Sequence, residues 1–169
     1  PYLLILGCIL TFLQACAPVQ RHVLFSSDNG DGTYTNPVIN ADYPDPDIIR
    51  VEDTYYMIST TMHMMPGGVV LRSYDLLHWE IASYVFAALD HTPGQRLCDG
   101  IGIYGKGMWA ASLKYHDGIF YVCFVANDTG KTYLYTAKEV SGPWEKHQIE
   151  GFYHDCSLFF EDDGSVYLM

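Results

Sequence analysis

Residues 45–59 read DPDIIRVEDTYYMIS, and two later segments repeat the same arrangement: WAASLKYHDGIFYVCF from residue 109 and DCSLFFEDDGSVYLM from residue 155. In each segment a short apolar-rich run leads to an Asp eight residues after its start, namely Asp53, Asp117 or Asp163. A second run of aromatic and β-branched residues follows each Asp. Asp-Gly or a similar pair between two such runs is a strong hairpin signal, so the sequence predicts three equivalent β-hairpins.

A second feature follows the first two hairpins. Residues 70–81 read VLRSYDLLHWEI and residues 133–146 read YLYTAKEVSGPWEK, each a strand-like run, an acidic turn and a Trp-Glu pair. Each repeat therefore holds about four strands within roughly 45 residues, which is typical of a propeller blade. The longer first step between repeats implies an insertion at residues 85–108. We predict an all-β fold: an incomplete β-propeller of about two and a half blades, clipped at both ends.

The composition excludes several classes of protein. The 169 residues carry 20 acidic and 9 basic side chains, a net charge of −11, which argues against a nucleic acid as the partner. Apolar residues make up 49% of the chain and aromatic residues 15%, so the chain is not of the disordered class. The five Cys form no C-x-x-C pair, and we predict neither a zinc site nor a disulfide scaffold from them.

Residues 1–16 form a separate segment. Their first thirteen residues, PYLLILGCILTFL, carry no charge, and the run is short for a membrane span but suits a signal peptide. LQAC at residues 13–16 resembles the bacterial lipobox, in which the Cys, here Cys16, is lipidated. We expect a lipoprotein signal peptide, clipped at its start, and a protein anchored to a bacterial membrane outside the cytoplasm. A buried strand or helix is the alternative.

Residues 17–35 are predicted to be a tether, and residues 36–169 the N-terminal part of the propeller domain. SSDNGDG at residues 26–32 is a cluster of turn-forming residues. A calcium loop is the alternative, but glycines stand where an EF-hand loop needs oxygen ligands. We therefore predict a turn there and no metal site.

The repeats also align three chemically distinct residues: Asp45, Trp109 and Asp155 each begin their unit. Equivalent residues at the start of the innermost strands of a propeller converge on its central axis, so the sequence predicts one pocket shared by two carboxylates and an indole. Two carboxylates flanking a sugar are what glycosidic bond cleavage needs, and a nearby like charge raises one carboxyl pKa. The alternative is that the Asp residues cap turns between blades.

Several short motifs in these segments resemble glycoside hydrolase family 43. They are NPV (36–38), YPDPDIIR (43–50), DTYY (53–56), SYDL (73–76), MWAA (108–111), YHDG (115–118) and HDCSLF (154–159). Their order and gaps match the family from residue 36 to residue 169. The resemblance implies a five-bladed β-propeller that hydrolyses arabinofuranosyl or xylosyl linkages with inversion.

The resemblance also implies roles for individual residues. Asp45 is expected to be the general base, and Asp155 to orient the general acid and tune its pKa. Trp109 is expected to line the sugar pocket, and His63 to border it. The family's general acid is a Glu in a later blade, so we expect this segment by itself to be inactive. No cofactor is expected to be required, although later blades could hold a structural calcium.

The expected function is therefore hydrolysis of O-glycosidic bonds in arabinose- or xylose-containing oligosaccharides or polysaccharides of plant cell walls. An α-L-arabinofuranosidase or a β-xylosidase is the expected type of enzyme. The alternative is a non-catalytic propeller that binds carbohydrate or another protein. A Glu in a later blade would favour the enzyme, and its absence would favour the binding protein.

Overall fold

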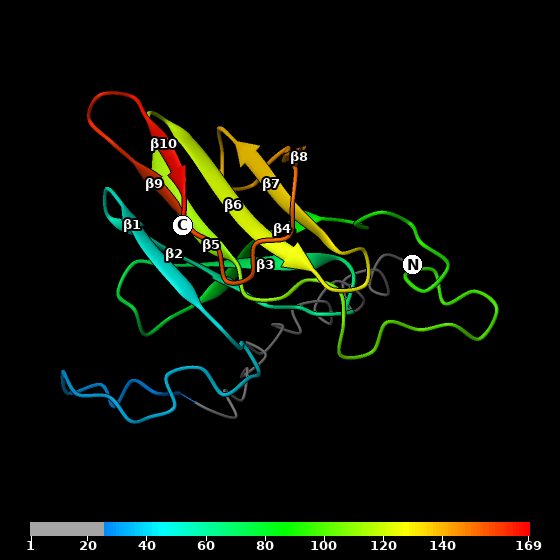
Figure 1. The fold of residues 1–169 in the computed structure, drawn as a ribbon. Helices are drawn as coiled ribbons and strands as arrows, with labels where there is room; N and C mark the ends of the chain where they lie inside the picture. Colours follow the sequence, from blue (N-terminus) through cyan, green and yellow to red (C-terminus); the bar gives the residue numbers. More distant parts are fainter. Residues whose placement is uncertain (1–25) are drawn as a thin grey trace, which may run out of the picture.

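The computed structural model describes residues 26–169, and its strands form three antiparallel sheets (Figure 1). The strands are β1 (Asp47–Val51), β2 (Thr54–Ser59), β3 (Gly67–Ser73), β4 (Glu80–Phe86), β5 (Ser112–His116), β6 (Ile119–Ala126), β7 (Lys131–Ala137), β8 (Glu145–Ile149), β9 (Leu158–Phe160) and β10 (Val166–Leu168). Every regular element in the described part of the chain is a strand, as the all-β prediction requires.

The three predicted hairpins are present. Asp117-Gly118 joins β5 to β6, and both residues have positive φ, 48° and 79°, which a two-residue type I′ turn requires. Glu52-Asp53 joins β1 to β2 in another two-residue loop. The longer turn between β9 and β10 contains Asp163. All three Asp residues therefore lie in hairpin turns, as their equivalent positions in the repeats predict.

Each of the first two repeats forms one blade. Strands β1-β2-β3-β4 form a four-stranded meander, β5-β6-β7-β8 form a second, and β9 with β10 begins a third sheet. In Figure 1 the third sheet lies beside the second blade, on the side of β5 and β6. The prediction of a propeller portion with two blades and the opening of a third is confirmed.

The largest buried cluster lies between the first two blades. An aromatic stack forms its centre: the rings of Phe86 and Phe124 lie 5.7 Å apart, and those of Phe124 and Tyr133 5.5 Å apart. Other members from both blades include Ile58, Val70, Leu113 and Val122. Burying each such side chain contributes about 1.5–3 kcal/mol, so this shared cluster holds the two blades together.

The predicted insertion connects β4 to β5 and is tied to the second blade through Asp90. The Asp90 carboxylate accepts hydrogen bonds from Lys131 Nζ at 2.8 Å, from the Tyr133 hydroxyl at 2.9 Å and from Lys146 Nζ. Burial by itself raises the pKa of Asp90, but the hydrogen bonds from the two lysines and the tyrosine more than offset it, and the pKa falls to about 2.

We expect Asp90→Ala to lower the free energy of unfolding by about 2 kcal/mol, because the buried Tyr133 hydroxyl loses an acceptor and the lysines lose a charged partner. Urea unfolding of the complete protein measures this loss.

The lowered pKa of Asp90 also sets how this stabilisation depends on pH. The stabilisation is complete above the unfolded-state pKa of about 4 and is lost as the pH falls towards 2. Asp53→Ala is the control, since the Asp53 side chain is 98% exposed. Equal urea midpoints for the two variants would contradict the anchoring role.

The segment before β1 packs against the first blade. Gly30 N donates to Asp28 Oδ1 at 2.8 Å, and Thr33 N donates to Asp31 Oδ1 at 2.9 Å. Both carboxylates therefore stabilise the predicted turn by accepting backbone hydrogen bonds. His78 of the first blade lies 3.9 Å from Asp28. The predicted signal peptide with Cys16, and residues 17–25 of the predicted tether, lie outside the described residues. Within residues 26–169, no helix combines the length and the apolar character that crossing a membrane requires.

Candidate active site

Asp45 precedes β1, and the end of β2 holds it in place. Its φ is 48°, a left-handed conformation that Asp tolerates better than most residues, and Pro44 and Pro46 restrict the backbone on either side. Ser59 Oγ and Thr60 N both donate to the Pro44 carbonyl, at 2.6 and 3.1 Å. Thr60 Oγ1 donates to Asp45 Oδ2 at 3.0 Å. The carboxylate is therefore held by the hydroxyl of a buried residue that directly follows β2.

Asp45 and Asp155 line one hollow of about 370 Å³. Asp155 also has positive φ, 53°, so the two residues share a backbone conformation as well as a place in the repeat. The remaining lining residues are Pro46, Asp47, Ala110, Ala111, Ser112, Lys114, Cys156 and Ser157. All three repeats thus contribute to this hollow, and it brings together the two carboxylates that the repeat pattern aligned.

Neither carboxylate serves as a turn cap within the described residues. Asp45 accepts its hydrogen bond from a side-chain hydroxyl, and the one ion pair of Asp155 there is with His154, at 3.5 Å. The Asp155 side chain is three-quarters exposed. This geometry differs from that of Asp28 and Asp31, whose carboxylates accept from backbone N–H groups. It favours a ligand-facing interpretation of Asp45 and Asp155 over the turn-capping one.

Asp47 and Lys114 lie in the same hollow and join the first two blades. Asp47 Oδ2 accepts from Leu113 N at 2.8 Å and from Lys114 Nζ at 3.4 Å. The hollow therefore contains three carboxylates and one ammonium group. Sequence reasoning missed this pair, although a charged residue at the start of the apolar β1 was an available signal.

Trp109 directly precedes the lining residues of the hollow but is not one of them, and its expected place in the sugar pocket stays a prediction. Its backbone N donates to Val125 O at 3.0 Å, and its ring meets the His154 ring edge-on, with centroids 5.1 Å apart. The following residues, Ala110 and Ala111, line the hollow in its place. The ring is 36% exposed, so one part of it stays open to a ligand.

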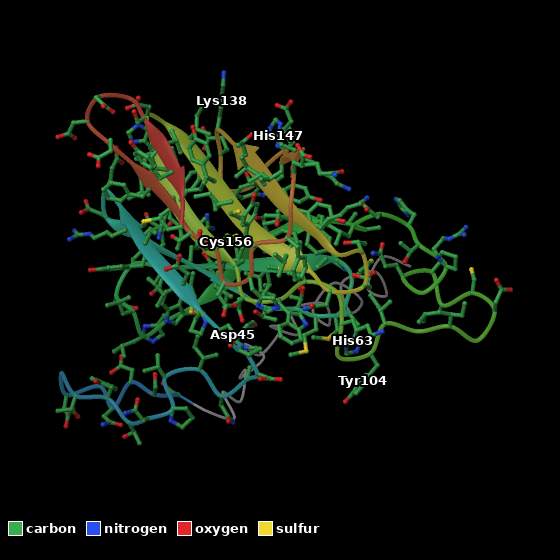
Figure 2. All side chains as sticks on the ribbon, viewed as in Figure 1. Asp45, His63, Tyr104, Lys138, His147 and Cys156 are labelled. Atoms are coloured by element: carbon green, nitrogen blue, oxygen red, sulfur yellow. The ribbon has the colours of Figure 1, made fainter. Side chains whose placement is uncertain are left out.

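His63 lines a second hollow, of about 240 Å³, next to the first. Its ring packs against that of Tyr104 with centroids 4.9 Å apart, and its Nδ1 is buried with no hydrogen-bond partner within residues 26–169. Thr60 lines this second hollow and also donates to Asp45, so the two hollows adjoin. Figure 2 shows Asp45, His63 and Tyr104 along the same side of the molecule.

Tyr104 belongs to the insertion and was not predicted as a site residue. It is 87% exposed, and with Gly105 it forms one wall of the second hollow. Tyr104 and Gly105 thus bring the glycine-rich part of the insertion to the second hollow. The chemistry available here is therefore carboxylates in one hollow and an aromatic wall in the next.

None of the Glu side chains in residues 26–169 lines the hollow of Asp45 and Asp155. Glu80, at the start of β4, pairs instead with Arg72 at 2.7 Å. The base and the supporting carboxylate that the sequence predicted are thus in one place, and the described part of the chain adds no Glu to them.

Known proteins resemble this chain in sequence and in fold. A β-xylosidase from Formosa agariphila is 44% identical over 119 residues, covering 70% of this chain and 20% of that protein. The non-reducing end α-L-arabinofuranosidase BoGH43B from Bacteroides ovatus is 34% identical over 142 residues, covering 81% and 26%. A solved structure from Bacteroides eggerthii, described as bifunctional GH43-CE, superposes with a TM-score of 0.77 at 48% identity, covering 80% and 19%.

The chain spans about a fifth to a quarter of the length of these relatives. The sequence profile of glycosyl hydrolases family 43 matches residues 34–169, which include both blades, the third hairpin and the carboxylate hollow. With four-fifths of its length matched by the profile and its fold matched by the solved structure, the chain belongs to glycosyl hydrolases family 43.

Proposed function

We propose that the protein containing this chain hydrolyses O-glycosidic bonds of xylosyl or arabinofuranosyl residues in plant cell-wall oligosaccharides or polysaccharides. The observation that carries the proposal is the meeting of Asp45 and Asp155 in one hollow. The related β-xylosidase and α-L-arabinofuranosidase support the class of sugar. Both lines of support concern the same residues, since the matched segment contains the hollow.

In the proposed reaction Asp45 is the general base. Its carboxylate accepts a proton from a water molecule as the water attacks the anomeric carbon of the terminal pentose. Thr60, by donating to Oδ2, fixes the direction of the carboxylate and leaves Oδ1 free for the water. The departing oxygen needs a proton, and we propose that a Glu from a later blade supplies it.

We propose that Asp155 positions that Glu and raises its pKa, since a neighbouring negative charge favours the protonated form. An inverting reaction needs the acid and the base about 6.5–9.5 Å apart, with room for the attacking water between them. The open hollow offers that room beside Asp45. The exposed part of Trp109 would pack against the C–H face of the pentose, and His63 with Tyr104 would border the next sugar.

Hydrolysis assays of the complete protein test the proposal. We expect turnover of 4-nitrophenyl β-D-xylopyranoside or 4-nitrophenyl α-L-arabinofuranoside, with the matching β-D-glucopyranoside as a control that is turned over at least about 10-fold more slowly. Binding of a xylo- or arabino-oligosaccharide without turnover of either pentoside would favour the non-catalytic alternative. The absence of both binding and turnover would refute the proposed function.

We also propose that Cys16 carries a lipid and holds the protein at a bacterial membrane outside the cytoplasm. The support is the uncharged run followed by LQAC at residues 13–16. Cys16→Ser should move the protein from the membrane fraction to the soluble fraction, because stable anchoring needs its acyl chains. Cys8→Ser, in the same segment, should leave the protein in the membrane fraction. Immunoblots of the two fractions decide the matter, and membrane retention of Cys16→Ser would refute the lipid anchor.

A further inference from the structure

Two buried thiols meet between the second and third sheets. Cys123 lies on β6, Cys156 lies just before β9, and their Sγ atoms are 3.2 Å apart. The two residues are 0% and 3% exposed. They are 33 positions apart in the sequence, and no strand pairing links the second sheet to the third. Cys156 also follows Asp155 directly, so this contact lies immediately behind one carboxylate of the hollow.

The surroundings of the two thiols suit a disulfide. Cys123, Cys156 and Leu158 form one apolar cluster, with the rings of Tyr121 and Phe160 among the residues packed against it. The single hydrogen bond that the structure gives either sulfur joins it to the other. A disulfide here would therefore leave no buried polar group without a partner.

The two sulfurs differ in access and in acidity. Cys156 lines the hollow that contains Asp45, whereas Cys123 does not. The hydrogen bond from Cys123 lowers the pKa of the Cys156 thiol, and the same bond together with burial raises the pKa of the Cys123 thiol. Cys156 therefore lies on the side from which a small reagent in the hollow would approach, and it is the better nucleophile because the thiolate is the reactive form.

We propose that Cys123 and Cys156 form a reversible disulfide that links the second blade to the segment carrying Asp155. The oxidant is a small-molecule disulfide, such as oxidised glutathione. The Cys156 thiolate attacks one of its sulfurs, forms a mixed disulfide and releases one small thiol. The Cys123 thiolate then attacks the Cys156 sulfur and releases the second small thiol. Two protein thiols are oxidised to one disulfide while the small disulfide is reduced to two thiols, so atoms and electrons balance.

A link at this place closes a loop of 33 residues and restricts the unfolded chain. We expect the oxidised protein to melt about 5 °C above the reduced protein. The link would also fix the position of Asp155 relative to the second blade.

The test is a peptide map of the complete protein after incubation with oxidised glutathione or with dithiothreitol. Each sample is unfolded, alkylated and digested with trypsin. Cys123 lies in the tryptic peptide 115–131, and Cys156 lies in the peptide that begins at residue 147. We expect the oxidised sample to contain these two peptides joined, about 2 Da lighter than their sum, and the reduced sample to contain both in alkylated form.

Cys98→Ser is the matched control, because Cys98 lies in the insertion and its sulfur contacts the Arg96 carbonyl rather than another thiol. The control should still give the joined peptides, whereas Cys156→Ser should leave Cys123 alkylated. Alkylation of both cysteines after oxidation would overturn the proposal, as would glutathione that stays on Cys156 while Cys123 is alkylated. The wild-type map decides this even if a variant fails to fold, and its outcome does not depend on whether the protein hydrolyses sugars.

Discussion

Asp45→Asn should lower kcat of the complete protein on xylosyl or arabinofuranosyl substrates by about 10³-fold, because the amide cannot accept the proton of the attacking water. The substitution keeps the size of the side chain, and its amide oxygen still accepts the hydrogen bond from Thr60. Binding of an oligosaccharide should therefore change little. Steady-state kinetics give the change in kcat, and isothermal titration calorimetry gives the affinity.

Asp53→Asn is the matched control for this result. Asp53 belongs to the same repeat, but it lies in the β1–β2 turn and its side chain is 98% exposed. The same chemical change there should leave kcat within about two-fold of the wild-type value. If Asp45→Asn also kept wild-type turnover, Asp45 would not be the base.

Asp155→Asn should lower kcat by about 10²-fold and change the pH dependence as well. Its carboxylate is proposed to raise the pKa of the general acid, so removing the negative charge lowers that pKa. The acid works only while it is protonated, and its pKa sets the alkaline limb of the pH profile of kcat/KM. This limb should therefore move to lower pH.

The shift of the alkaline limb separates a positioning role from a purely structural one. A variant that is merely misfolded loses rate at every pH and keeps the position of the limb. Asp162→Asn, on the exposed β9–β10 turn of the same repeat, is the control and should match the wild-type profile. A slow Asp155→Asn enzyme with an unmoved alkaline limb would contradict the proposed role.

The strands and blades could be predicted from the sequence because local signals and repetition agreed. The Asp117-Gly118 turn is a strong local signal, since type I′ geometry needs residues that tolerate positive φ. The other hairpins are weaker individually but stand at the same position in their repeats. Repetition also placed Asp45 and Asp155 at one hollow, since equivalent residues of successive blades converge in space.

Residues of the insertion, and contacts between one repeat and another, could not be predicted in this way. Tyr104 and Asp90 lie in the insertion, which has no counterpart in the second repeat, and their contacts depend on the path of a long connection. The Trp109 ring packs against His154, which lies next to the start of another repeat. The meeting of Cys123 and Cys156 likewise requires two sheets to be placed side by side. Single-residue contacts between repeats leave no periodic trace in a sequence.

The central claim is that a pentose binds in the hollow between Asp45 and Asp155 and that Asp45 activates the water. A crystal structure of the Asp45→Asn protein with an unhydrolysed xylo- or arabino-oligosaccharide tests it most directly. The account predicts the terminal pentose in this hollow, with one water between its anomeric carbon and the side chain at position 45. A sugar bound elsewhere, or an anomeric carbon out of reach of position 45 through a single water, would contradict it.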